Sequence, residues 1–269
     1  MPDYDLKGMK SHSMYRLDAY IGRMSTSMKW IDFKDESRKI CDYFLTLSAA
    51  NLLVDMKIDF YYHNLCRSAE NWRRYLLTSR DHYKKQAPLT YISPLYAAVA
   101  AGEVSLVKGI SDLIPDAHVE GEEYPDKFLI AKVLALVASN GVELTDQITS
   151  LLKQMEEVED EPLSSNLFKA LLGVDELKEE DFWDAFEAAH YAHDEMNEEK
   201  ITNVTVKISE FIAHRFIWFE GIAWLKLAKM KGFTLPSNGF KYCPDEALGK
   251  MKKPYMGDWP LVPLPDGSF

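Results

Sequence analysis

The sequence predicts an all-α protein, in which a single multi-helix domain of antiparallel helices surrounds a central apolar helix and carries a proline-rich, extended C-terminal arm. Apolar residues at helical spacing dominate from about Met14 to Met230, and no convincing alternating strand interrupts them. Short connections favour antiparallel neighbours. Six prolines follow Thr234 and exclude a long helix there. We therefore expect a helical domain over residues 1–233 and an arm over 234–269 packed on it.

Three long helices are expected first. The apolar residues of the first have helical spacing at Met14, Leu17, Ile21, Met24 and Met28. The second runs through Ile40 and Leu52, with Asp35 in a position to cap its start. The third, around 58–83, mixes aromatic residues with arginines. Two prolines then interrupt the pattern within 86–94, which marks a candidate joint between subdomains.

A helix hairpin is expected next, over Ser93–Ile110. Ser93 is the expected N-cap, Pro94 fits the first helical position, and Gly102 ends the first helix before a second begins at Glu103. Apolar periodicity predicts the remaining helices at about Pro125–Ser139, Leu144–Val158, Pro162–Leu172, Glu179–Asn197 and Ile201–Lys231.

The last of these helices is the predicted centre of the domain. It is apolar on nearly every side, as a helix enclosed by others must be, and we expect Trp218 and Trp224 to be largely buried. Lysines fill its final turns and Gly232 follows, which predicts a left-handed C-terminal cap.

His214 and Glu220 interrupt this apolar helix and are expected to be buried polar residues with structural roles. A carboxylate among apolar side chains is costly unless it is paired or protonated. We expect Glu220 to pair with Arg73 or Arg74 of the third helix, or to cap a neighbouring helix terminus. A general acid or base with a raised pKa is the alternative, but no companion nucleophile is in view.

One arrangement suggests metal chemistry. Glu187 and His190 form a Glu-x-x-His pair, and Glu210 lies one helical turn before His214. Carboxylate-bridged di-iron bundles use two Glu-x-x-His pairs and two further inward glutamates. Here the second pair has the wrong spacing and the further glutamates are missing, apart from Glu220 as an arguable one. Ordinary hydrogen bonding of the histidines is the favoured interpretation, and no metal or cofactor is expected.

The negative charge is concentrated in one region. The net charge is +4 over residues 1–102, −18 over 103–200 and +3 over 201–269. Such a surface repels nucleic acid and attracts basic partners, although charge runs usually only solvate a face. The densest acidic clusters, which are candidate partner contacts, are Glu120, Glu122 and Glu123; Glu156, Glu157, Glu159, Asp160 and Glu161; and Glu179, Glu180 and Asp181. The last three are also placed to stabilise a helix N-terminus.

Cysteine usage and hydropathy indicate a cytoplasmic protein. Cys41, Cys66 and Cys243 are an odd set without metal-ligand spacing and are expected to be reduced, buried thiols. No apolar stretch approaches the roughly 20 residues that cross a bilayer, and the N-terminus lacks the apolar run of a signal peptide.

Residues 180–246 resemble the immunity-49-type family of bacterial immunity proteins, which are encoded beside polymorphic or type VI secreted toxins. The resemblance rests on Phe182, Trp183 and Phe186, on the segment 219–228 (F-E-G-I-A-W-L-K-L-A), on Lys231-Gly232-Phe233, and on Tyr242-Cys243-Pro244. It implies an all-helical, non-enzymatic antitoxin that neutralises a cognate toxin by stoichiometric binding in the cytosol. The family supplies no catalytic residues.

The functional expectation is therefore an immunity protein that occludes the active site of a toxin with a basic cleft, without binding nucleic acid or membrane. Two alternatives remain open. One is a metal-dependent helical-bundle oxidase built on the Glu187, His190, Glu210 and His214 set, and the other is a non-enzymatic α-helical scaffold.

Overall fold

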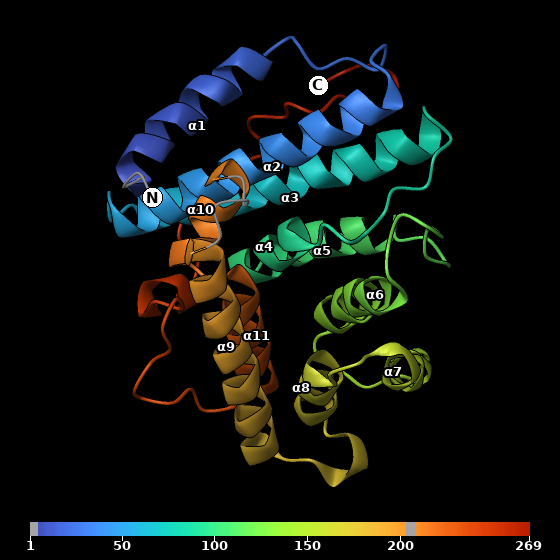
Figure 1. Cartoon of the computed structure of the whole chain (residues 1–269), viewed down its shortest axis with the longest axis vertical. Coiled ribbons are helices and arrows are strands. Elements are labelled where there is room, and N and C mark those ends of the chain that lie inside the picture. Colours follow the sequence, from blue (N-terminus) through green and yellow to red (C-terminus); the bar gives the residue numbers. More distant parts are fainter. Residues whose placement is uncertain (1–4, 203–207) are drawn as a thin grey trace.

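Two long antiparallel helices, α2 (Trp30–Leu53) and α3 (Ile58–Asp81), form the centre of the fold in the computed structural model, which describes residues 5–202 and 208–269. They lie side by side along their length (Figure 1). Both are lined with fully buried side chains, including Phe44 and Trp72. Helix α1 (Leu6–Tyr20) covers α2, and α4 (Ser93–Ala101) packs on α3.

The other helices extend from this pair in a chain of neighbours (Figure 1). From α5 to α9, each helix packs against the next, and α11 packs on α4 and on α8, while α10 packs on α2. Their bounds are α5 (Val104–Ser111), α6 (Pro125–Ser139), α7 (Asp146–Val158), α8 (Leu163–Leu172), η1 (Val174–Glu176), α9 (Glu179–Thr202), α10 (Ile208–Phe216), α11 (Phe219–Lys231) and η2 (Asp245–Leu248). The described residues contain no β-strand, so the predicted all-α class is confirmed.

Three local predictions near helix starts and ends are wrong. Helix α2 begins at Trp30, so Asp35 lies inside it and caps nothing. Helix α1 ends at Tyr20, and the chain after it turns, although Met24 still reaches the core. Ser93 is the first residue of α4 rather than its N-cap, a position held by Ile92. At the end of α1 the apolar spacing continues across the turn because the loop residue Met24 is also buried.

The predicted central helix 201–231 is also wrong, because the chain is broken between α10 and α11. The backbone of Trp218 leaves the helical region, at φ −90° and ψ 86°. Its N–H donates to the carbonyl of Tyr242 at 2.9 Å instead of continuing the helix. The buried positions of Trp218 and Trp224 are confirmed, as is the left-handed cap at Gly232, where φ is 96°.

The indole of Trp218 folds back over Gly221, in the first turn of α11. A β-carbon at Gly221 would lie 2.0 Å from Cε3 of that ring, so only glycine fits. The same ring lies against Phe186 of α9, with centroids 5.3 Å apart. The break therefore fixes α11 against α9 through a tryptophan rather than through continuous helix.

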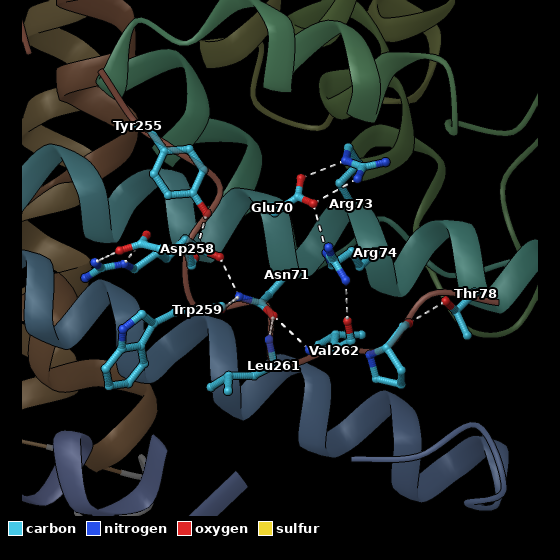
Figure 2. Close-up of polar contacts among 12 residues, drawn as sticks. Glu70, Asn71, Arg73, Arg74, Thr78, Tyr255, Asp258, Trp259, Leu261 and Val262 are labelled. Carbon is cyan, nitrogen blue, oxygen red and sulfur yellow. Dashed lines mark hydrogen bonds and ion pairs between the residues drawn. The ribbon is translucent and has the colours of Figure 1, made fainter. Parts of the chain in front are cut away.

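The C-terminal arm runs along α3 in the same direction as the helix, held by the buried side chain of Asn71 (Figure 2). Asn71 Oδ1 accepts the N–H groups of Leu261 and Val262 at 2.8 and 2.9 Å. Its Nδ2 donates to the carbonyl of Trp259 at 3.1 Å. One amide thus satisfies three backbone groups of a segment that has no strand partner.

The arginines of α3 form ion pairs with the arm and with a glutamate of their own helix. Arg67 binds both carboxylate oxygens of Asp258, whereas Arg73 and Arg74 both pair with Glu70, at 2.7 and 2.9 Å (Figure 2). The arginine predicted to neutralise Glu220 is therefore engaged elsewhere. Cys41, Cys66 and Cys243 are buried and unpaired, as the sequence predicts.

Replacing Gly221 with alanine is expected to destabilise the protein by about 1–3 kcal/mol, because the Trp218 ring must move to admit the methyl group. Urea denaturation followed by circular dichroism measures this loss. Gly249→Ala is the control, since its φ is −69° and the new methyl meets nothing closer than 3.5 Å. Equal free energies of unfolding for the two variants would contradict the close packing of Trp218 on Gly221.

Asn71→Leu is expected to cost about 2–5 kcal/mol, because two buried N–H groups lose their acceptor. It should also speed tryptic cleavage after Lys250 and Lys252, in the arm. Thr78→Val, which removes only the 2.8 Å bond to the carbonyl of Pro263, is expected to cost about 1 kcal/mol. A protease-resistant arm in Asn71→Leu would show that apolar contacts alone hold it.

Candidate functional site: a polar cavity and an acidic groove

A cavity of about 170 Å³ lies between α4, α9, α10 and α11, beside the break in the predicted central helix. Tyr96, Trp218 and Phe219 form the aromatic part of its wall. The polar residues that line the cavity are Ser93, His193, Asn197, Lys200, His214 and Glu220. These residues are far apart in sequence and come together because α9 and α11 meet near the start of α4 (Figure 1).

Glu220 lines this cavity from the first turn of α11 and is partly buried. Its Oε1 accepts the Tyr96 hydroxyl at 3.1 Å. Burial raises the pKa of the Glu220 carboxyl, and hydrogen bonding from Tyr96 offsets this rise only in part. The predicted pairing with Arg73 or Arg74 is wrong, because a tyrosine hydroxyl satisfies the carboxyl instead.

His214 and His193 face the same cavity from α10 and α9, and both side chains are partly buried. The pKa of each imidazole is lowered to about 4, chiefly by burial and in part by the nearby Lys200 ammonium. His193 stacks on Trp218, with centroids 4.8 Å apart and planes 17° apart. Both rings are therefore neutral at pH 7 and present a nitrogen lone pair.

The Glu-x-x-His pair is not assembled with other ligands. Glu187 is exposed on α9, and His190 Nε2 lies 3.1 Å from the carbonyl of Lys241 in the arm. The side chain of Glu210 lies outside the described residues. Across the part of the chain that the structure describes, no three histidine, cysteine or acidic side chains converge as a metal site would require.

A second cavity, of about 470 Å³, adjoins the first and shares Ser93 and His214 with it. Asp42 and Arg38 of α2 line it together with Tyr91, whose hydroxyl donates to Asp42 Oδ1 at 2.6 Å. These residues were not predicted from the sequence. A carboxylate within the apolar run of α2 was the available signal, since such a group must find a partner.

The acidic clusters differ in how far their carboxylates are engaged. Glu123 is buried and accepts the N–H groups of Leu89 and Val119, both at 2.6 Å, so it holds the loop before α6. Glu159 accepts two N–H groups at the start of α8. Exposed acidic side chains of the clusters are Glu120, Glu122, Glu156, Glu157, Asp160, Glu161, Glu180 and Asp181.

The third cluster, at the start of α9, hydrogen-bonds both to that helix terminus and to the arm. Glu179 accepts the N–H of Thr234 at 2.6 Å, which ties the arm to α9, and Asp181 accepts the N–H of Lys178. Helix-terminus stabilisation, the alternative weighed from the sequence, is therefore supported for Asp181.

A groove of about 570 Å³ includes part of the second cluster (residues 156–161), whereas the first cluster (residues 120–123) lies just before the segment that lines it. Tyr124, Asp126 and Lys127 line it at the start of α6, and 158–161 line it from the α7–α8 loop. The Tyr124 and Val158 side chains in it are 73% and 41% exposed. We call this feature the acidic groove. The third cluster does not line it.

No family model, curated protein or solved structure matches this chain. None of the helices within the described ranges has the length and apolar character needed to cross a membrane.

The neutral imidazoles predict that acid weakens the fold. The unfolded chain binds protons near pH 6.5, whereas His193 and His214 in the folded chain bind them only near pH 4. Stability is thus fully present above pH 6.5 and falls as the pH drops toward 4, by up to about 3 kcal/mol per histidine. His214→Gln should reduce this fall, measured by urea denaturation at pH 7.5 and 5.0. A fall as steep as in the original protein would contradict a neutral, buried His214; His12→Gln, at an exposed position, is the control.

Proposed function

We propose that the protein is a bacterial immunity protein that neutralises a cognate secreted toxin by stoichiometric binding in the cytosol. The resemblance of residues 180–246 to the immunity-49-type family motivates the proposal. The acidic groove is the structural observation that supports it, because this concave surface site has carboxylates beside exposed apolar side chains.

The acidic groove has the two features that an inhibitor of a basic active site needs. The carboxylates of Asp160 and Glu161 are exposed and accept no hydrogen bond from the described residues, so their charge faces solvent and can steer a basic protein. Tyr124 and Val158 offer apolar area beside them, and buried aromatic anchors supply much of the affinity of protein interfaces. A basic cleft that binds phosphates complements both features.

The partner is expected to be the product of a toxin gene beside the gene for this chain. Co-expression should rescue growth from that toxin, and the purified proteins should form a complex of fixed stoichiometry by size-exclusion chromatography with light scattering. Absence of a toxin gene beside this one, together with no complex, would overturn the proposal in favour of a scaffold.

Reversal of charge in the acidic groove is expected to slow association. Asp160→Lys and Glu161→Lys, which line the groove, together with Glu157→Lys, one residue before its Val158, should lower the association rate constant about tenfold or more and flatten its dependence on salt, because steering falls with the local field. Stopped-flow fluorescence at several ionic strengths measures both quantities.

The control for net charge is a triple reversal of exposed α9 residues outside the acidic clusters, Asp184→Lys, Glu187→Lys and Glu195→Lys. It changes the total charge equally but leaves the groove intact. An equal loss of association rate in the two triple variants would show that only net charge matters and would remove the acidic groove from the interface.

A further inference from the structure

The cavity beside the α10–α11 break contains a buried polar atom without a partner. Asn197 is 2% exposed, and its Nδ2 donates to the carbonyl of Arg215 at 3.3 Å. Because that carbonyl can only accept, the other atom of the amide is the oxygen, Oδ1. Among the described residues Oδ1 has no hydrogen-bond partner, and neither has His193 Nε2 on the same wall. A buried polar atom left this way costs about 1–3 kcal/mol, so a donor is missing from the cavity.

The charge of the cavity wall indicates what kind of donor fits. Glu220 faces the cavity, and no lysine or arginine of the described residues forms an ion pair with it. The one lining cation, Lys200, lies partly exposed near the end of α9. A negatively charged ligand would meet the Glu220 carboxyl and the carbonyl oxygen of Asn197 in the interior. A ligand with positively charged N–H groups would meet acceptors there instead.

The aromatic part of the wall favours the same charge. Tyr96, Trp218 and Phe219 surround the polar atoms, and aromatic faces attract ammonium and guanidinium groups, most strongly where water is excluded. The volume of about 170 Å³ suits a short chain ending in such a group rather than a nucleotide or a sugar phosphate.

We propose that this cavity binds an organic cation with N–H donors, that is, a primary ammonium or guanidinium group on a short apolar chain. Asn197 Oδ1 and the Glu220 carboxylate accept its N–H groups, and Trp218 and Phe219 enclose its carbon chain. The proposal does not depend on the acidic groove or on the toxin, because none of the residues that line this cavity lines the groove. Such a group belongs either to a free small amine or to a lysine or arginine side chain of a protein.

Titration of the full chain with butylammonium chloride, followed by isothermal calorimetry and by the indole N–H signals in NMR spectra, tests the proposal. We expect a dissociation constant in the millimolar range, as is usual for a ligand of so few atoms, and a shift of the Trp218 signal. Neutral butanol should bind at least tenfold more weakly. Glu220→Gln and Asn197→Leu should each weaken butylammonium binding at least tenfold, while Glu187→Gln, exposed on α9, should leave it unchanged.

A blocked Gly-Arg-Gly peptide distinguishes the two sources of the cation. Binding of both probes supports the cavity as a receptor for a protein side chain, and binding of butylammonium alone supports a free amine. Circular dichroism confirms folding of each variant, and Glu220→Gln carries the test if Asn197→Leu does not fold. The proposal is overturned, and the cavity is one filled by water, if any of four results is obtained. These are equal binding of butanol, unchanged butylammonium affinity in Glu220→Gln, stronger binding of chloride or phosphate, and no binding of either cation.

Discussion

The hydrogen bond from the backbone N–H of Trp218 to the carbonyl of Tyr242 determines much of the second half of the structure. It takes the donor that would have continued α10, so the chain turns and α11 starts in a new direction. The indole then has room only because residue 221 has no side chain. Without this bond, Glu220 and His214 would share one helix, and the cavity between α4, α9, α10 and α11 would not exist.

The same bond connects the site to the arm, because Tyr242 lies where the arm begins to cross the domain. Tyr242 also donates its hydroxyl to Asp194 of α9 at 2.8 Å. From there the chain reaches α3, where Asn71 receives it (Figure 2). The arm therefore acts as a strap that joins α9, α11 and α3, three helices that are distant in sequence, and it positions the cavity residues relative to the α2–α3 pair.

The sequence was sufficient for what local periodicity and capping decide. The helix Pro125–Ser139 has the predicted bounds, and Gly102 and Gly232 end helices as left-handed residues. The sequence was insufficient where a group distant along the chain determines the local structure. No proline or glycine lies in the ten residues before Trp218 to mark the break. The backbone N–H of Trp218 instead binds a carbonyl 24 residues further along the chain. Likewise, Glu220 could be recognised as a costly carboxyl but not assigned to Tyr96, whose hydroxyl comes from a separate helix 124 residues away.

The dependence of α3 on the arm has a consequence for biosynthesis. Asn71 leaves the ribosome long before its partners, because Leu261 follows it by 190 residues. At about 5–20 residues per second, this interval lasts roughly 10–40 s. During that time the face of α3 that will receive Leu261 and Val262 has no covering segment from this chain, and an incomplete chain presents it to solvent and to chaperones. The central helix pair is thus completed only after Leu261 and Val262 have been made.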